Sequence, residues 1–474
     1  MCKSKCEEVL ITQSNRKVRS KQIDMLNGPL LGKILLFALP VAASGILQQL
    51  FNSTDMAGVV GRFAGSQSLA AVGGNGSVIN LLITLFIGLS IGANVVIANY
   101  IGQNKKEKVH EAVHTTMSIA IVSGFVLLVS GQFIARPILL LMGTPGDVID
   151  LATLYLKIYF LGMPFIMIYN FGSAVLRSVG DTRRPLYALL VSGFINVGLN
   201  MLLVIVFKLD VAGVAIATSL ANGVSAGIVV YYLINEDSDI KLSLRELSLN
   251  KDHMARIFKI GAPAGIQGMV FSISNVCIQS AINGFGSYAV AGSAAAVNFE
   301  IFTYFVTNSF AQAAVTFTSQ NFGAQKYQRC KSIFRICICM GLVFTFIMNQ
   351  SFIHWRYFFI DFYTSDSKVV HYAIIRMLEV ELFTSIPVFY EVGAGALRGI
   401  GHSLLPAILT TIGSCLFRIF WVFTIFKDVS KFSKLMSVYP ITWIITTVLV
   451  MFFYYRVRKK EFYRQRVSID SSNI

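Results

Sequence analysis

The sequence predicts an all-α polytopic membrane protein, with twelve transmembrane helices in two pseudo-symmetric six-helix lobes that form a parallel internal repeat. The first observation is composition: 55% of the 474 residues are hydrophobic, 14% are charged, and the mean hydropathy is +0.65. The second is that residues 63–104, 261–299 and 435–455 contain no Asp, Glu, Lys or Arg. The third is that Gly, Pro and Arg positions of the first half recur in the second.

Apolar runs of about 20 residues, bounded by charge or by Gly and Pro, predict the individual helices. The first set of six lies near residues 31–60, 72–101, 112–134, 151–174, 186–207 and 211–233. The second set lies near 260–285, 290–320, 332–353, 372–396, 404–426 and 438–455. The first run is too long for a signal peptide and lacks a small-residue cleavage site, so we expect a retained helix.

The polar segments divide the chain into five parts. We expect a cytoplasmic N-terminal tail at 1–30, an N-lobe at 31–234, a cytoplasmic linker at 235–256, a C-lobe at 257–455 and a basic C-terminal tail at 456–474. The linker is the longest charged stretch inside the chain, and the amphipathic spacing of Leu242, Leu244 and Leu247 lies within it.

The formal net charge of +16 raises the question of a nucleic-acid partner. The 40 Lys and Arg residues, however, lie mostly in the two tails and in alternate short loops rather than on one face. By the positive-inside rule we expect both termini in the cytoplasm, a multi-pass location in the cell membrane, and no nucleic-acid binding. Lys427, Lys431 and Lys434 are exceptions, because this topology places them outside.

The seven cysteines form no disulfide framework, and we expect free thiols. Cys2 and Cys6, in the basic tail, are candidates for lipidation or metal binding, with exposed thiols of no special role as the simpler alternative. The sequence contains no GxxxxGK[ST] phosphate loop and no CxxC pair. We therefore expect no enzyme activity, no ATP hydrolysis, no resident metal and no cofactor, so that the energy comes from an ion gradient of H⁺ or Na⁺.

The first apolar run carries a single carboxylate, Asp55. On a helix, Ser44, Gln48, Asn52 and Asp55 fall within an arc of roughly 80°, which makes a polar stripe. An ionisable group in a spanning helix indicates an ion or substrate site that faces water or the bundle interior. The alternative is that Asp55 lies near the far interface and reaches headgroup water. Pro40 removes a backbone hydrogen bond, so it can bend the first helix. The bend is either a moving part of the helix or only an adjustment to the packing of its neighbours.

The internal repeat has a nearly constant offset. Residues 38–40 (ALP) match 261–263 (GAP) at an offset of 223, and at 221 Gly102 pairs with Gly323, Leu176-Arg177 with Leu397-Arg398, Gly180 with Gly401, and Pro185 with Pro406. A parallel repeat in a transporter places the pathway at the lobe interface. Arg177 and Arg398, in matching loops, are candidates for a cytoplasmic gate; contact with lipid phosphate, or the positive-inside rule alone, also explains them.

Several stretches occur in a recognisable order between Leu30 and Arg456. They are LPVAASGILQQLFNSTD, ANYIGQNKKEK with its partner SQNFGAQKYQR, VLRSVGDTRRP with its partner ALRGIGHSLLP, then NVGLN and DVAGVAIATS. In this order, and with the repeat, the chain resembles the multidrug and toxic compound extrusion (MATE) family. The resemblance implies two six-helix lobes in a V around a central cleft, which expel cationic or amphipathic compounds against an inward flow of H⁺ or Na⁺.

The resemblance also implies site residues. In prokaryotic members the first-helix acid works with polar groups on the fifth and sixth helices, and these positions fall on Asp55, Asn196, Asn200 and Thr218. Several relatives carry Asp where this chain has Asn200, so the chain departs from a two-carboxylate cation site. The alternative for the two Asn and the Thr is that they join helices through hydrogen bonds.

The second half has no symmetric twin of Asp55, because the equivalent position is Ile278. The preferred substrate acids of that half are Glu300 and Glu391, the latter aligned with Asn170; either could instead pair with Arg418. With Gln48 and Asn52 from the polar stripe, these residues are the candidates that line a substrate cleft.

The predicted function is a secondary active multidrug efflux transporter that exchanges a cation, H⁺ in preference to Na⁺, by alternating access. One alternative is a flippase of a lipid-linked precursor, which would need a strongly cationic cleft. Another is a membrane prenyl-transfer enzyme, which would need an acidic DxxxD-type metal site that we do not find. The expected partners are small amphipathic or cationic compounds and membrane lipids, and we expect a monomer.

Overall fold

The computed structural model describes residues 22–53, 65–142, 144–364, 366–425 and 431–472, and every regular element in these ranges is helical. The first half contains α2 (Leu30–Ser53), α3 (Gly65–Gly102), α4 (Lys106–Leu141), α5 (Ile149–Leu161), α6 (Met163–Ser178), α7 (Arg183–Asn200), the π-helical η3 (Met201–Val206) and α8 (Asp210–Ile234). The second half contains η4 (Leu244–Glu246), α9 (Lys251–Asn283), α10 (Ser287–Gly323), α11 (Tyr327–His354), α12 (Arg356–Asp361), α13 (Ser367–Glu379), η5 (Glu381–Phe383), α14 (Pro387–Gly399), α15 (Leu404–Thr410), the π-helical η6 (Thr411–Leu416), α16 (Phe417–Phe423), α17 (Phe432–Met436) and α18 (Val438–Ser472).

Ten helices within the described residues are long and apolar enough to cross a membrane, and α5 with α6, bent by 48°, make an eleventh crossing. The predicted continuous helix at 372–396 was wrong. This segment is broken into α13, η5 and α14, and α14 begins at Pro387. Proline is favoured in the first turn of a helix and unfavourable further inside it, because it has no N–H to donate. Counted as one broken crossing, α13 with α14 completes the predicted twelve.

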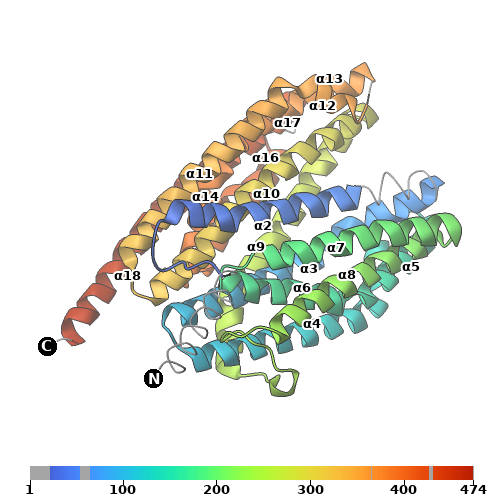
Figure 1. Ribbon diagram of the computed structural model, residues 1–474. Coiled ribbons are helices and arrows are strands. Elements are labelled where there is room, and N and C mark those ends of the chain that lie inside the picture. The colour runs from blue at the N-terminus through green and yellow to red at the C-terminus, as the bar shows by residue number, and fades with distance from the viewer. Residues whose placement is uncertain (1–21, 54–64, 143, 365, 426–430, 473–474) are drawn as a thin grey trace, which may run out of the picture.

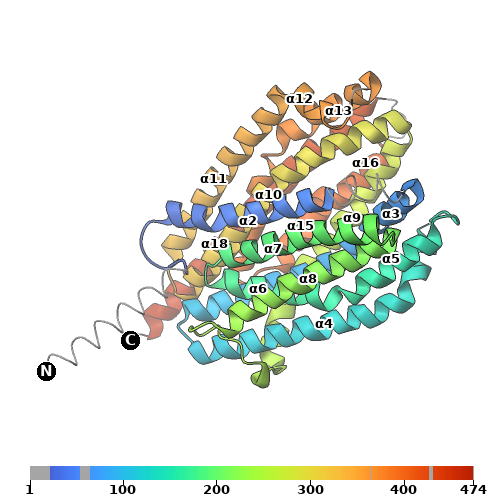
Figure 2. The ribbon, with the colours of Figure 1, turned by 45° about the vertical axis from the view of Figure 1, so that its right-hand side comes forward.

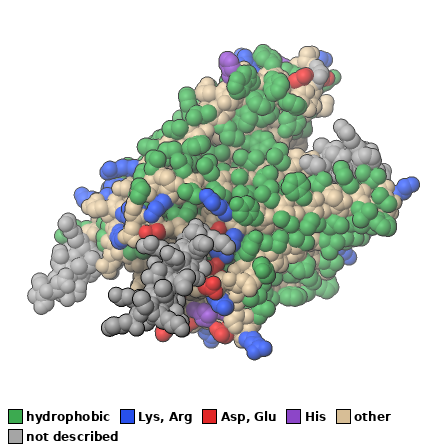
Figure 3. Space-filling model, viewed as in Figure 1, with side chains coloured by type: hydrophobic (Ala, Val, Ile, Leu, Met, Phe, Trp, Pro, Cys, Tyr) green, Lys and Arg blue, Asp and Glu red, His purple; other side chains and the backbone are tan. Residues whose placement is uncertain are grey.

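The two halves of the chain form two lobes. Figures 1 and 2 show α3–α8 in one lobe and α10, α11, α13 and α16 in the other, converging at one end of the molecule and diverging at the opposite end. We call the converging end, where α3 ends at Gly102 and α10 ends at Gly323, the basal end. In Figure 3, Lys and Arg side chains gather at this end, whereas hydrophobic side chains cover both arms. That distribution suits a protein embedded in a bilayer with one basic face.

The backbone repeats the predicted offset of 221 residues at the basal loops. Gly180 and Gly401 both have positive φ, 87° and 92°, and Asn104 and Gln325 have φ of 56° and 59°. A positive φ is uncommon outside glycine, so its recurrence at equivalent positions is strong evidence of one structural unit used twice. The internal repeat is therefore present in three dimensions and not only in the sequence.

The same symmetry governs how the lobes touch. A β carbon at Gly102 would lie 2.0 Å from the carbonyl oxygen of Gln320, and one at Gly323 would lie 2.3 Å from the carbonyl oxygen of Asn99. These two contacts are exchanged by the repeat, because Asn99 and Gln320 are also 221 residues apart. Each lobe thus brings its glycine against the other lobe's backbone, as small residues do where membrane helices pack closely.

Candidate functional site

A small cavity lies between the lobes. Its volume is about 20 Å³, room for about one water molecule. Four helices line it, α3 and α6 from the first half and α10 and α14 from the second: Ile91, Asn94, Arg177, Asn308, Ala311, Gln312, Val315, Thr316, Glu391 and Arg398. The structure therefore brings both predicted gate arginines and one predicted substrate acid to the same place.

The lining of this cavity carries more positive than negative charge. Arg177 and Arg398 contribute two guanidinium groups, and Glu391 contributes a single carboxylate. The Arg398 side chain is buried, and its Nη2 donates a hydrogen bond to Oε1 of Gln267 at 2.7 Å. Ionisable side chains at membrane depth are expensive and mark transport pathways. The two arginines, which the sequence analysis could only place in matching loops, are thus part of the interior.

Three hydrogen bonds join the lobes next to the cavity. The Thr316 hydroxyl donates to Oδ1 of Asn94 at 2.9 Å, and the Ser319 hydroxyl donates to the carbonyl of Val95 at 2.7 Å. One turn closer to the basal end, the buried Gln320 amide donates to the carbonyl of Ser178 at 2.6 Å. These bonds connect α10 to α3 and α6, so they hold the cavity closed towards the basal end.

Residues 22–28, which we call the N-terminal strap, lie across the basal end. Nζ of Lys326 donates to the carbonyl of Leu26 at 3.0 Å, and Arg329 donates to the carbonyls of Met25 at 3.2 Å and Asn27 at 3.0 Å. Met25 is 1% exposed, and Nδ2 of Asn321 donates to its carbonyl at 3.1 Å. The strap is therefore fixed to the second lobe through its own backbone.

The strap also reaches the first lobe. Nε2 of Gln22 donates to Oε1 of Glu236 at 3.2 Å, and Gly180 lies so close to Ile23 that a β carbon there would come within 2.8 Å of it. Burial of Asp24 raises its pKa, but hydrogen bonds from the backbone N–H of Leu26 and the Asn27 side chain outweigh burial and hold the pKa below its ordinary value. The strap thus adds a second connection between the lobes at the basal end.

The polar group predicted on the fifth and sixth helices does assemble, between α7 and α8. Nδ2 of Asn196 donates to the Thr218 hydroxyl at 3.4 Å, and Nδ2 of Asn200 donates to Oδ1 of Asn196 at 3.3 Å. Asn196 and Asn200 are both buried. Asp55, the acid assigned to this group, lies outside the described residues.

The polar stripe of the first helix is described up to Ser53. Gln48 and Asn52 are both exposed on α2, which fits a water-filled cleft better than lipid contact. α2 continues as one helix through Pro40. Asn170 is partly buried on α6, where its amide donates to the carbonyl of Ile166 at 2.9 Å, and it is not among the residues that line the cavity.

Glu300 lies away from the cavity, in an ion pair. Nε and Nη2 of Arg376 donate to its two carboxylate oxygens at 2.6 Å and 2.9 Å, and Arg376 is 4% exposed. Arg418, the partner considered in the sequence analysis, bonds instead to Thr442 at 3.3 Å and stacks on the Tyr439 ring at 4.5 Å. The carboxylate of Glu300 is therefore neutralised within its own lobe, which leaves Glu391 as the predicted acid that faces the lobe interface.

Sequence reasoning misplaced one buried polar residue and missed others. From the sequence, Glu381 was considered a solvated acid near the outer end, which was wrong: it is completely buried, and its Oε1 accepts a hydrogen bond from Thr303 at 2.8 Å. Asn94, Gln267 and Gln312 escaped notice, although Asn94 and Gln312 line the cavity and Gln267 holds Arg398. A search for Asn and Gln within the predicted helices 72–101, 260–285 and 290–320 would have found all three.

The MatE family model matches residues 40–202 and 263–424, which is one match in each half. The probable multidrug resistance protein YoeA of Bacillus subtilis is 26% identical over 441 residues, covering 90% of this chain and 94% of that protein. The multidrug export protein MepA of Staphylococcus aureus strain NCTC 8325 is 21% identical, covering 73% and 76%.

Solved structures share the fold. A MATE family transporter of the MOP superfamily, described as outward-facing, superposes with a TM-score of 0.87 at 20% identity, covering 94% of this chain and 99% of that one. A MOP superfamily transporter from Pyrococcus furiosus, described as having a binding pocket of reverse polarity, superposes with a TM-score of 0.84 at 21% identity, covering 93% and 98%. The predicted twelve-helix, two-lobe fold is confirmed. Because the family model matches well over half of the chain, in both lobes, this protein belongs to the MATE family of multidrug efflux transporters and is a transporter rather than an enzyme.

Proposed function

We propose that this protein is a secondary active multidrug exporter that exchanges an inward-moving cation for an outward-moving small compound by alternating access of its two lobes. One observation carries the proposal: Arg177 and Glu391, from different lobes, line a single interfacial cavity whose basal side is closed by hydrogen bonds across the interface. A site between two lobes that is closed on one side is what alternating access requires.

The basal end is the cytoplasmic end in this proposal, and both termini are cytoplasmic. Its support is the concentration of Lys and Arg there, as the positive-inside rule expects. A single cysteine introduced as Ser248→Cys in a cysteine-free background tests the orientation, because Ser248 is exposed in the segment between the lobes. We expect an impermeant thiol reagent to label it only after the cells are permeabilised. Labelling in intact cells would reverse the topology.

Close packing of glycines between the lobes supports the rocking motion. A β carbon at Gly88 on α3 would lie 2.1 Å from the backbone nitrogen of Gly265 on α9, and one at Gly92 would lie 2.7 Å from that of Gly261. Backbones that approach without side chains between them can shift against each other with little rearrangement of rotamers. The α3–α9 contact is therefore the pivot in this mechanism.

The coupling ion we favour is H⁺, carried by Asp55 with Asn196, Asn200 and Thr218 as its polar neighbours. The last three residues, joined by hydrogen bonds, supply amide and hydroxyl groups but no second carboxylate. One negative charge suits a proton better than a dehydrated Na⁺, which prefers more anionic oxygen ligands. The energy is sufficient, because one proton crossing about 150 mV releases roughly 3.5 kcal/mol, about 2.5 decades of substrate gradient.

The test is transport by the purified protein in proteoliposomes loaded with a fluorescent lipophilic cation. We expect efflux when the outside is made acidic, and none when the gradient is collapsed with a protonophore. Efflux that responds only to an imposed Na⁺ gradient would overturn the choice of ion. Absence of gradient-driven efflux with either ion would overturn the exporter proposal itself. A drug-susceptibility profile in a pump-deficient host, with and without the gene, identifies which compounds are exported.

A second candidate substrate class follows from the charge of the cavity. The two guanidinium groups of Arg177 and Arg398 outnumber the one carboxylate of Glu391, so the cavity favours a compound with an acidic group. This charge balance supports the alternative of a lipid-linked precursor as the substrate. The Pyrococcus furiosus relative, with its pocket of reverse polarity, is a precedent in the same fold. The proteoliposome assay separates the two classes when an amphipathic anion and an amphipathic cation are compared as competitors of the same dye.

A further inference from the structure

Two histidines stand on one face of α4 near the basal end. Residues 110–114 read HEAVH, an HExxH motif, in which the spacing i, i+4 places both imidazoles on the same side of a helix. In the structure their ring centroids are 4.2 Å apart. The expectation of no resident metal assumed that the sequence contains no HExxH motif, and that assumption was wrong.

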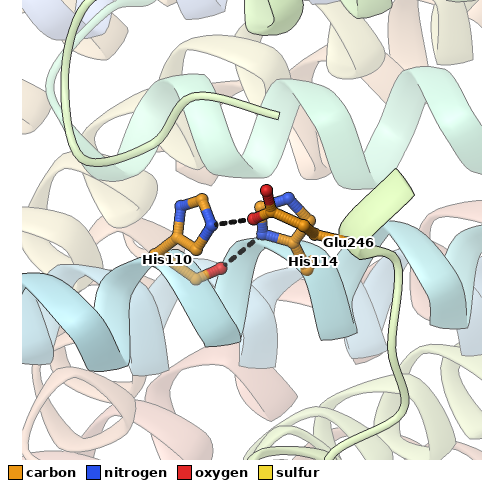
Figure 4. A group of neighbouring side chains, drawn as sticks. All are labelled: His110, His114 and Glu246. Atoms are coloured by element: carbon orange, nitrogen blue, oxygen red, sulfur yellow. Dashed lines mark hydrogen bonds and ion pairs between the residues drawn. The ribbon is translucent and has the colours of Figure 1, made fainter. Parts of the chain in front are cut away.

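A carboxylate from the segment between the lobes faces these rings. Oε2 of Glu246, in η4, lies 2.7 Å from Nε2 of His110, although the two residues are 136 positions apart in the chain. Figure 4 shows both imidazoles rising from α4 towards Glu246. The three side chains can each offer one ligand atom, and these atoms all lie within 4.8 Å of one another.

The buried member, His114, has the tautomer and orientation of a metal ligand. It is 1% exposed, and its Nδ1 donates to the carbonyl of His110 at 2.8 Å, so the lone pair of Nε2 is directed away from α4. There it accepts the backbone N–H of Ser243 at 3.0 Å. A ligating histidine in proteins usually donates its other ring N–H to a carbonyl or carboxylate, which fixes its tautomer.

We propose that His110, His114 and Glu246 bind a divalent transition-metal ion of the Zn²⁺ type. Two imidazole nitrogens and one carboxylate oxygen are a ligand set found around Zn²⁺, whereas Mg²⁺ and Ca²⁺ prefer oxygen alone. Tetrahedral coordination needs ligand atoms about 3.3 Å apart at Zn–N distances near 2.0 Å. The His110–Glu246 pair, at 2.7 Å, must therefore open slightly, and no other pair needs to close by more than about 1.5 Å. Ser243, which is partly exposed, then turns its N–H to water.

The Glu of the motif has a different partner. Oε2 of Glu111 lies 2.9 Å from Nε2 of His253 and accepts a hydrogen bond from Nδ2 of Asn250 at 3.4 Å. It therefore helps to hold the start of α9 and is not one of the three ligands. The site is thus assigned to metal binding, with no hydrolytic step.

The position of the site gives the metal a structural consequence. Segment 235–250 connects the two lobes and contacts α4 at several points. Two of these contacts, Glu246 with His110 and the Ser243 N–H with the buried His114, lie at the proposed site. A bound ion replaces these two contacts with coordinate bonds from both sides. It therefore fastens the connecting segment to the first lobe at the basal end.

The experiment measures metal binding by the full-length purified protein. Isothermal titration with Zn²⁺, and absorption of the Co²⁺ form, are recorded in a background carrying Cys2→Ser and Cys6→Ser, which removes the thiols of the N-terminal tail as ligands. We expect one equivalent per chain, with the visible absorption bands of tetrahedral Co²⁺. His110→Ala and Glu246→Gln should each weaken binding by about tenfold or more. Glu246 is exposed and His110 is half-exposed, so neither substitution leaves a buried cavity and we expect folding to be preserved.

Two matched variants serve as controls. His371→Ala removes an exposed imidazole from α13, and Glu111→Gln removes the motif carboxylate that is not a ligand, so both should retain the wild-type affinity within about threefold. Hydrogen exchange gives a second measurement: Zn²⁺ should protect residues 235–250 in the wild type but not in Glu246→Gln. The proposal is overturned if the wild type binds no stoichiometric Zn²⁺, if His110→Ala and Glu246→Gln bind as tightly as wild type, or if Glu111→Gln abolishes binding.

Discussion

Arg177 and Arg398 occupy equivalent positions in the two halves of the chain, and both line the cavity between the lobes. Symmetry alone would give the two arginines equal surroundings, but their environments differ. Arg398 is buried and held by Gln267, whereas Arg177 is partly exposed. The carboxylate of Glu391 has no equivalent in the first half, where Asn170 stands. The asymmetry of the cavity therefore comes from the second lobe.

Glu391→Gln tests the role of this carboxylate. If Glu391 attracts cationic substrates, the amide should weaken their binding by about tenfold, equivalent to about 1.4 kcal/mol, and leave uncharged substrates unaffected. Dye-binding titrations in detergent measure both. Glu379→Gln is the matched control, because Glu379 accepts a hydrogen bond from Ser433 and does not line the cavity. Equal affinities of the wild type and Glu391→Gln for a cation would exclude Glu391 from substrate binding.

Gly102→Ala and Gly323→Ala test the reciprocal contact between the lobes. Each new methyl group would collide with backbone, the Gln320 carbonyl in one case and the Asn99 carbonyl in the other, so it cannot be relieved by rotating a side chain. We expect each variant to lose about 1–3 kcal/mol of stability and to melt at a lower temperature. Gly227→Ala is the control, since nothing lies within 4 Å of its β carbon. If the variants melted at the wild-type temperature, the interface between the lobes would have to accommodate the added methyl groups without loss of stability.

Much of the fold could be predicted because its signals are local or repeat along the chain. Apolar length predicted the crossings, and the offset of 221 predicted the equivalent turns at Gly180 and Gly401. The group formed by Asn196, Asn200 and Thr218 was anticipated from the resemblance to the MATE family, which implies polar groups on the fifth and sixth helices.

Other features depend on which helices meet, and no local pattern reveals that. The pairing of Glu300 with Arg376 requires α10 to lie against α13, and the approach of Glu246 to His110 requires the connecting segment to fold back over α4. The break between α13 and α14 ends at Pro387, a signal that the sequence does show, but the buried position of Glu381 beside Thr303 comes from tertiary packing.

Glu300→Gln tests whether the ion pair with Arg376 is structural. Loss of the carboxylate leaves a buried guanidinium without its counter-charge, which costs about 3–5 kcal/mol. We expect a markedly lower melting temperature for Glu300→Gln and for Arg376→Met. The double variant Glu300→Leu/Arg376→Met should melt above either single variant, because no uncompensated charge remains. Additive losses in the double variant would contradict the pairing.

Lys326→Ala/Arg329→Ala tests the N-terminal strap. The double variant removes the side chains that hold the carbonyls of Met25, Leu26 and Asn27, so the basal end should open more often. Ser319→Cys, at a completely buried position between the lobes, reports the opening through its rate of alkylation in a cysteine-free background. We expect the rate to rise by about tenfold. Arg335→Ala, an exposed arginine on α11, should leave it unchanged. An unchanged rate in the double variant would mean that the strap does not hold the lobes together.

Asp55→Asn tests the coupling ion. A lone carboxylate removed from bulk water has its charged form disfavoured, which suits uptake of a proton on one side and release on the other. The amide cannot carry a proton through this cycle, so concentrative efflux should be lost while the protein stays folded and binds substrate with near wild-type affinity. Proteoliposomes under an imposed pH gradient measure efflux, and dye binding with a melting curve confirms folding. Asn200→Asp is the complementary variant: a second carboxylate beside Asn196 adds the anionic oxygen that Na⁺ requires, so efflux should gain a response to a Na⁺ gradient. Full pH-driven efflux by Asp55→Asn would remove Asp55 from the mechanism, and a wild-type response to Na⁺ alone would show that the single carboxylate is sufficient for that ion.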